Sequence, residues 1–270
     1  MTTTGIVLCG GRSSRMGRDK AWLPWRGRPV LEHVVEQLAT AVDEVLVVSA
    51  PGQILPEIPA RRVEDQHEGL GPLAGLAAGL AACKPGLSFV TASDAPFLSA
   101  AFVSALLAPG TAAAPADGER VHPLSGAYPV DAAEAAQELL DRGRRRPLDL
   151  LEYSQFKALP LSSLPGAQAV AGFNTPGEYL AAARADTPGG VARVVFVSPE
   201  SSTPKRTCEV AIGSLAEVLE AAEGATRWAE GERLAPGHRV ALPGHSDMRD
   251  LRVPIGAGEE IRVFEEARRA

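Results

Sequence analysis

The chain has 270 residues, and its 45% hydrophobic and 22% charged residues are typical of a folded globular protein rather than a disordered chain or a fibrous repeat. At about 150 residues per domain, this length indicates about two domains. The 27 Lys and Arg residues are outnumbered by 33 Asp and Glu residues, and the net charge of -6 argues against a dedicated nucleic-acid-binding protein.

The cysteines and the N-terminal segment indicate a cytoplasmic protein. Cys9, Cys83 and Cys208 lie far apart without a CxxC pair, which excludes a disulfide framework and a cysteine-based zinc site. The N-terminus lacks the basic and apolar regions of a signal peptide, and no segment approaches about eighteen consecutive apolar residues. We therefore expect no membrane association.

Short apolar runs alternate with helical patterns in the first part of the chain, which is typical of a parallel sheet covered by helices. Pro29 can occupy the first turn of a helix, and Pro72 can begin another that extends to Lys84. Gly75 and Gly79 lie on one face of the second helix and permit close backbone approach. The other predicted elements are strands at Gly5–Leu8, Val45–Ser49, Leu87–Thr91 and Arg120–Tyr128, and helices at Ala132–Arg142 and Pro176–Ala185.

A composition change near residues 186–190 marks a domain boundary. The sequence ADTPGG is typical of a linker, and a new apolar run follows it. We predict one domain at residues 1–187 and a smaller one at residues 191–270. Ser214 and Glu217 form a capping-box pattern at the start of a helix in the second domain. This domain is predicted to contain strands at Val191–Val197, Thr207–Ile212 and Glu260–Phe264 and a helix at Ser214–Ala222.

The segment LCGGRSSRMGRDKAWL, Leu8 to Leu23, is the main candidate for chemistry. Gly10 and Gly11 allow a tight turn with exposed backbone N–H groups, and Arg15 and Lys20 add positive charge. Residues 1–30 hold six basic side chains and one acidic one, so positive charge is concentrated in this segment of an acidic protein. The segment predicts an anion-binding loop; the alternative is a glycine-rich turn with solvated charges.

Two familiar phosphate-binding motifs do not fit this loop. A P-loop requires Gly-Lys after a Gly and four further residues, whereas Lys20 comes three residues after Gly17. The dinucleotide fingerprint GxGxxG is broken by the adjacent Gly10 and Gly11. The loop therefore represents another class of anion site.

GGRSSRMGRDK closely resembles the signature of molybdenum cofactor guanylyltransferases, within the nucleotidyltransferase superfamily. The resemblance covers about the first 187 residues and implies a Rossmann-like, three-layer α/β nucleotidyltransferase domain. Further segments resemble the same family in the same order: Glu64-Asp65 followed by GLGPLAGL, SDAPF at Ser93–Phe97, HPLSGAYP at His122–Pro129 and FNTPGEYL at Phe173–Leu180.

Asp94 is the predicted metal ligand. It follows the strand predicted at Leu87–Thr91, and the carboxyl ends of strands in open α/β sheets are where ligands bind. A carboxylate there suits Mg2+, which prefers oxygen ligands and bridges substrate phosphates. The alternative is that Asp94 only caps the turn at Ala95-Pro96.

The resemblance also implies roles for individual residues. Lys20 would contact the α-phosphate region and Arg15 would be a second cation, so the catalytic set is Arg15, Lys20 and Asp94. Cys9 is interpreted as a packed thiol rather than a nucleophile. The predicted nucleotide-binding residues are Leu8, Cys9, Gly10, Gly11, Lys20, Ser49, Asp65, Gly75 and Asp94.

One position departs from the family pattern. The family has Asn-x-Asn-Thr-Pro in its final motif, whereas this chain has Gly172 at the first position and retains only Asn174. A role of the first amide toward metal or pterin is therefore in doubt for this chain. His122, in the preceding motif, is interpreted as structural, because an attacking phosphate is already ionised.

The implied function is transfer of GMP from GTP to molybdenum-molybdopterin, with Mg2+ as cofactor and pyrophosphate as the second product. GTP and molybdenum-molybdopterin are thus the expected partners, together with molybdenum cofactor biosynthesis proteins or molybdoenzymes, and without nucleic acid. The alternatives are a related nucleotidyltransferase using CTP or a sugar phosphate acceptor, and a non-catalytic cofactor carrier or docking protein.

Residues 191–270 loosely resemble the sulfur-carrier subunit of molybdopterin synthase, which implies a β-grasp-like α+β domain. A working sulfur carrier needs a free Gly-Gly terminus, whereas this sequence ends in EEARRA and its Gly189-Gly190 pair lies in the linker. An accessory β-rich domain of other ancestry is the alternative. Since the signature loop, Asp65 and Asp94 precede residue 187, we expect residues 1–187 to act without this domain.

Overall fold

The structure is a computed structural model. Contacts divide the chain into a first unit, Met1–Arg12 with Leu31–Gly172, and a second unit, Ser13–Val30 with Phe173–Ala270, and each unit is described by itself. No described helix is long and apolar enough to cross a bilayer. The structure describes residues 2–10, 15–65, 69–197, 204–223 and 228–265.

A mixed sheet forms the centre of the first unit. Its strands are β1 (Thr2–Leu8), β4 (Glu44–Ser49), β5 (Arg61–Glu64), β6 (Gly86–Ala92), β7 (Ala113–Asp117), β8 (Arg120–Val121), β9 (Ser125–Pro129) and β10 (Lys157–Pro160). The order is β10-β7-β9-β6-β1-β4-β5, with β8 paired to β7. Strands β6, β1, β4 and β5 run parallel, whereas β9 is antiparallel to β6 and β7. The sheet is therefore rich in parallel pairs, as predicted.

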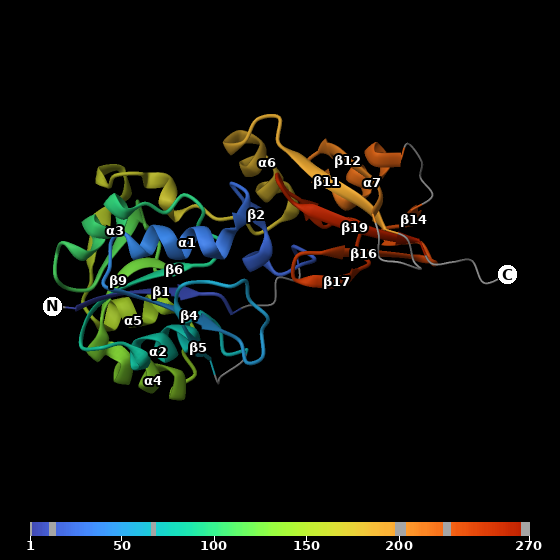
Figure 1. Cartoon of the computed structure of the whole chain (residues 1–270). Coiled ribbons are helices and arrows are strands. Elements are labelled where there is room, and N and C mark those ends of the chain that lie inside the picture. The colour runs from blue at the N-terminus through green and yellow to red at the C-terminus, as the bar shows by residue number, and fades with distance from the viewer. Residues whose placement is uncertain (1, 11–14, 66–68, 198–203, 224–227, 266–270) are drawn as a thin grey trace. The chain divides into compact units, whose positions relative to one another are not determined.

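Both faces of this sheet are covered by helices (Figure 1): α1 (Val30–Ala39), α2 (Pro72–Ala82), α3 (Ala100–Leu107), α4 (Ala133–Asp141) and α5 (Pro147–Tyr153). Ile6 and Leu8 pack with α2, α4 and α5 in one apolar cluster, and the neighbouring residue Gly5 faces Leu38 of α1 on the other side. Phe89 of β6 meets Phe102 of α3 edge to face, with ring centroids 6.3 Å apart, an arrangement that aromatic pairs favour. The predicted three-layer α/β class is thus confirmed. The unit also contains the short 3-10 turns η2 (Val130–Ala132), η3 (Leu161–Ser163) and η4 (Ala167–Val170).

The strand predicted at 120–128 is interrupted. The backbone N–H of Ser125 donates to the carbonyl of His122 at 3.1 Å, which forms a turn between β8 and β9. As a result β8 pairs with β7, whereas β9 pairs with both β6 and β7. The apolar pattern of this segment does not reveal the turn, because it depends on the pairing with two different neighbours.

The second unit combines residues from both ends of the sequence. It contains the 3-10 turn η1 (Lys20–Trp22) and the helices α6 (Pro176–Asp186) and α7 (Leu215–Glu223). Its strands are β2 (Pro24–Trp25), β3 (Arg28–Pro29), β11 (Val191–Val197), β12 (Pro204–Ala211), β13 (Gly213–Ser214), β14 (Ala229–Glu230), β15 (Arg233–Leu234), β16 (His238–Leu242), β17 (His245–Met248), β18 (Pro254–Ile255) and β19 (Glu260–Glu265).

The main sheet of the second unit has the order β12-β11-β19-β16-β17. Strands β11 and β12 form an antiparallel pair, and the last strand, β19, lies parallel to β11 at the centre. Val194, Leu219 and Val263 are among the buried residues of the apolar cluster that joins this sheet to α7. This arrangement agrees with the predicted β-grasp-like fold. The proposed independence of residues 1–187 and 191–270 stays a prediction, because contacts within the folded chain do not test it.

The capping box predicted at Ser214 is present at the start of α7. The hydroxyl of Ser214 accepts a hydrogen bond from the Glu217 N–H at 3.3 Å, and the Glu217 carboxylate accepts one from the Ser214 N–H at 2.7 Å. These bonds satisfy backbone donors that a helix cannot satisfy internally.

Ser214→Ala should therefore lower the free energy of unfolding by about 1 kcal/mol, since it removes the capping oxygen. Urea denaturation followed by circular dichroism measures this difference. Ser214→Thr, which keeps the hydroxyl, is the matched control and should stay close to the parent protein. Equal losses in both variants would show that the cap does not stabilise α7.

Candidate functional site

The carboxyl ends of the parallel strands gather most of the predicted site residues of the first unit. The N–H of Cys9 donates to the Val48 carbonyl at 2.7 Å, and the N–H of Asp65 donates to the Ser49 carbonyl at 2.9 Å. On the other side of β1, the N–H of Ser93 donates to the Leu8 carbonyl at 3.1 Å. These bonds connect the strand ends that carry Leu8, Cys9, Gly10, Ser49, Asp65 and Asp94 along one edge of the sheet.

Gly75 brings helix α2 close to this edge. A Cβ atom at Gly75 would lie 3.6 Å from Leu8 Cδ2 and 3.8 Å from Asp65 Oδ2. Gly79, one turn further, is closer still, because its Cβ would lie 2.8 Å from Ile6 Cγ2. The predicted close approach of this helix face is therefore present, and it places α2 beside the half-buried carboxylate of Asp65.

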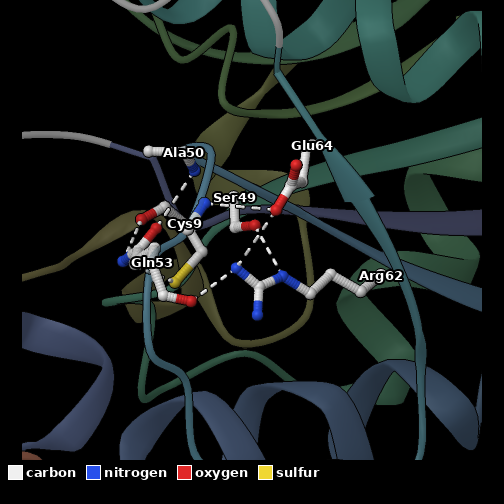
Figure 2. A network of polar contacts seen from close by, with 7 residues as sticks. Cys9, Ser49, Ala50, Gln53, Arg62 and Glu64 are labelled. Atoms are coloured by element: carbon white, nitrogen blue, oxygen red, sulfur yellow. Dashed lines mark hydrogen bonds and ion pairs between the residues drawn. The ribbon is translucent and has the colours of Figure 1, made fainter.

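Ser49 belongs to a polar network that supports the loop after β4 (Figure 2). Its fully buried hydroxyl accepts a hydrogen bond from Arg62 Nε at 2.9 Å. The side-chain amide of Gln53 donates to the Cys9 carbonyl at 3.2 Å, and its oxygen accepts from the Ala50 N–H at 3.1 Å. A contact of Ser49 with guanine or ribose stays a prediction, whereas its bond to Arg62 is a structural role.

Sequence reasoning missed both Gln53 and Arg62. Arg62 lies in β5, whose sequence RRVE is too short and too charged to indicate a buried strand, and Gln53 lies in the loop that precedes it. Their function depends on parallel pairing of β4 with β5, which places Arg62 opposite Val47. No local pattern in the sequence reports that pairing.

Asp94 follows β6 and is partly exposed, as its predicted role requires. Gly172 lies directly against it: a Cβ atom at Gly172 would be 2.7 Å from the Asp94 carbonyl oxygen and 3.3 Å from Oδ1. An asparagine at this position would require Asp94 to move. The departure from the family motif therefore coincides with a close backbone approach to the predicted metal ligand.

The donor set at this edge fits Mg2+ held jointly by protein and substrate. Within the described residues, no group of three or more His, Cys, Asp or Glu side chains could hold a metal ion. Mg2+ is commonly bound by one or two carboxylates together with substrate phosphates, so a single carboxylate such as that of Asp94 would fit a site of this kind. The carboxylate supplies the hard oxygen that this cation prefers.

The two predicted cations belong to the second unit. Arg15 is exposed, and Lys20 is half-buried in η1 with its Nζ donating to Asn174 Oδ1 at 3.3 Å. Asn174 immediately precedes Thr175, whose hydroxyl caps α6 and whose capping box includes Glu178. The structure thus brings the signature lysine together with the final motif. Gly11 lies outside the described residues.

His122 and Cys9 occupy environments that agree with structural roles. Burial lowers the pKa of His122, and nearby Arg120 lowers it further, so the imidazole is neutral at pH 7. The Cys9 side chain is 6% exposed, which limits its access to a substrate.

Comparison with known proteins identifies the same part of the chain. A family profile described as MobA-like NTP transferase domain matches residues 5–157. A protein of Mycobacterium avium (strain 104) named "Probable molybdenum cofactor guanylyltransferase" is 41% identical over 195 residues, which cover 68% of this chain and 97% of that relative. A protein of the same name from Mycobacterium tuberculosis (strain H37Rv) is 36% identical over 185 residues, covering 64% and 92%.

A solved structure shares the fold. Molybdopterin-guanine dinucleotide biosynthesis protein A from Archaeoglobus fulgidus is 24% identical and has a TM-score of 0.56. The alignment covers 65% of this chain and 94% of that protein. Because the family profile spans more than half of the sequence and includes the strands that carry Leu8, Ser49 and Asp94, this chain belongs to the MobA-like NTP transferase domain family.

Proposed function

We propose that this protein transfers GMP from GTP to molybdenum-molybdopterin, forming the guanine dinucleotide cofactor and pyrophosphate. The observation that carries the proposal is the alignment of Leu8, Asp65 and Asp94 at the carboxyl ends of β1, β5 and β6 along one edge of the sheet, where open α/β sheets bind nucleotides. Relatives that are 36% and 41% identical over most of their length, and that are named for this activity, support the same substrate pair.

Nucleotide recognition is proposed to use the edge formed by β1, β4 and β5. The backbone of Leu8, Cys9, Gly10 and Gly11 would face the nucleotide, with Ser49 and Asp65 near guanine or ribose. Gly75 supports this assignment because it lets α2 approach Asp65 closely. Arg62 and Gln53 hold the adjoining loop and would act as positioning residues.

The proposed reaction is an in-line displacement at the α-phosphorus of GTP. An oxygen of the terminal pterin phosphate forms the new P–O bond, and the bond from the α-phosphorus to the bridging oxygen breaks as pyrophosphate leaves. Arg15 and Lys20 would neutralise the charge that develops on the phosphates, and no proton must be removed from the ionised nucleophile. Asp94 would hold Mg2+, which when bound neutralises and orients phosphate oxygens.

We further propose that residues 1–187 form the nucleotidyltransferase domain and residues 191–270 a β-grasp-like domain related to sulfur carriers. Separate buried clusters support this division: one lies within residues 6–156 and the other within residues 192–263. The protein is proposed to act in the cytoplasm, with cofactor-synthesis proteins or molybdoenzymes as partners for its product.

Pyrophosphate release tests the substrate assignment directly. GTP, CTP and ATP are each supplied with Mg2+ and molybdenum-molybdopterin, and separately with a sugar phosphate. We expect release with GTP and the molybdenum-charged pterin. A preference for CTP or for the sugar phosphate would identify a related transferase instead, and nucleotide binding without turnover would identify a carrier.

Asp94→Asn should lower kcat for pyrophosphate release by at least about 100-fold, because the variant keeps the side-chain size but removes the charge that would hold Mg2+. Steady-state rates at increasing Mg2+ measure the effect. Asp117→Asn is the matched control, since Asp117 is an exposed carboxylate at the end of β7 in the same unit. Near-parental turnover of Asp94→Asn at saturating Mg2+ would contradict the metal role.

Lys20→Ala should reduce kcat by at least about tenfold, since a cation beside a transferring phosphate contributes a few kcal/mol to transition-state stabilisation. Single-turnover transfer measures this step. Lys84→Ala removes an exposed lysine after α2 and should leave the rate unchanged. If both variants transfer GMP at the parental rate, Lys20 does not act on the phosphates.

A further inference from the structure

Arg18 is the one basic residue of the segment 15–20 whose side chain is enclosed by the C-terminal sheet domain. Its Nη1 donates to Glu259 Oε1 at 2.6 Å and to the Pro254 carbonyl at 3.3 Å. The Arg18 and Glu259 side chains are 0% and 1% exposed. The second carboxylate oxygen accepts from the Gly256 N–H at 3.1 Å. Arg18 therefore directs its charge to Glu259, whereas Arg15 stays exposed.

Two further contacts attach the same loop to the C-terminal domain. The N–H of Asp19 donates to His245 Nε2 at 3.3 Å, and burial lowers the pKa of His245, which keeps the imidazole neutral and able to accept this bond. The backbone of Gly244 lies against the Trp22 indole, since a Cβ there would be 2.6 Å from Trp22 Cδ2. These contacts flank Lys20 on both sides in sequence.

Because both charges are buried, substitution of either Arg18 or Glu259 should weaken this attachment. Burial raises the pKa of Glu259, and the adjacent Arg18 guanidinium opposes that change by favouring the charged carboxylate. Arg18 Nε and Nη2 have no hydrogen-bond partner among the described residues, so the bond from Nη1 to Glu259 is the principal compensation for burying the guanidinium. Removing one member of such a pair leaves an uncompensated buried charge, which is strongly unfavourable.

We infer that Arg18 and Glu259 are positioning residues, and that their buried ion pair makes the C-terminal domain hold the loop carrying Arg15 and Lys20 in its nucleotide-binding conformation. The kinetic consequences rest on the proposed guanylyl transfer, whereas the attachment of the loop does not. Glu259 lies outside the residues matched by the family profile. This inference is an alternative to the expectation that residues 1–187 act without the C-terminal domain, and the variants below decide between the two.

Glu259→Gln in the full chain tests the inference, because a released loop should change KM and kcat differently. If the loop is released, only a fraction of the protein is competent to bind, so the apparent KM and Kd for GTP should rise at least about tenfold. At saturating GTP the bound loop is restored, so kcat should stay within about threefold of the parental value. Glu232→Gln is the matched control, because it removes an exposed ion pair with Arg252 in the same domain.

A purely structural role gives a different kinetic result. Partial unfolding would lower the amount of active protein, so the rate at saturation would fall while KM stayed constant. That result, or parental values of both constants in a folded Glu259→Gln variant, would overturn the positioning role. Circular dichroism at the assay temperature establishes the folded fraction.

Amide hydrogen exchange without nucleotide separates this inference from the proposed function. The N–H groups of Ala21, Trp22 and Leu23 are hydrogen-bonded within η1 to Asp19 and Lys20. Their exchange should be at least about tenfold faster in Glu259→Gln than in the parent or in Glu232→Gln, because the loop opens locally. Unchanged exchange would overturn the attachment even if the enzyme transfers GMP. Faster exchange in a protein without transferase activity would refute the proposed function alone.

The double variant Arg18→Met/Glu259→Met distinguishes positioning from direct phosphate binding and serves if the single variant fails to fold. An apolar pair leaves no buried charge, and such replacements are often neutral or stabilising. The double variant should therefore recover KM for GTP to within about threefold of the parent. A persistently raised KM in a folded double variant would show that Arg18 acts on the substrate itself and would overturn the inference.

Discussion

Parallel pairing of β1 with β4 on one side and β6 on the other is the constraint on which the first unit depends. It brings three strand ends, separated by about forty residues each in sequence, into hydrogen-bonded neighbours. The crossover from β1 to β4 through α1 and the one from β5 to β6 through α2 run in opposite directions across the sheet. Because such crossovers are right-handed, α1 and α2 cover opposite faces (Figure 1). Together with the parallel pairing of β4 and β5, the pairing of β1 with β4 and β6 aligns the backbone after Leu8 with Asp65 and Asp94.

In the second unit a buried ion pair accompanies an apolar core. Its sheet and α7 share one apolar cluster. Arg18, from the loop near the start of the chain, is buried in the same unit and pairs with Glu259. A buried ion pair adds little net stability compared with an apolar pair of similar shape, so its value lies in fixing which segments meet. Here the ion pair joins Arg18 of the signature segment to Glu259, which lies outside the residues matched by the family profile.

Gly172 stands where the family motif has its first asparagine. In the family pattern it is the loss of an amide, but in the folded chain it is a position where a Cβ atom would lie 2.7 Å from the Asp94 carbonyl oxygen. Lys20 meanwhile donates to Asn174, the amide that the motif retains. Both asparagine positions of the final motif therefore make contacts: Gly172 lies against Asp94, and Asn174 accepts a hydrogen bond from Lys20.

The fold class could be predicted from local patterns, because apolar runs and proline positions indicate whether each segment forms a strand or a helix. The strands near Val45–Ser49 and Val191–Val197 and the cap at Ser214 were all visible this way. The charged strand β5 was not, because its place depends on pairing with β4. Likewise, the interruption between β8 and β9 depends on which neighbours each segment finds.

The sequence by itself determined the α/β class, the nucleotidyltransferase signature and the strand-end position of Asp94, since these depend on periodicity and on contiguous residues. Only the tertiary structure decided that Arg62 supports Ser49, that Gly172 adjoins Asp94 and that Arg18 pairs with Glu259. Each of these contacts joins residues that are distant along the chain and that only the fold brings together. The sequence shows which side chains are charged, but only the folded structure shows which opposite charge lies beside each one when it is buried.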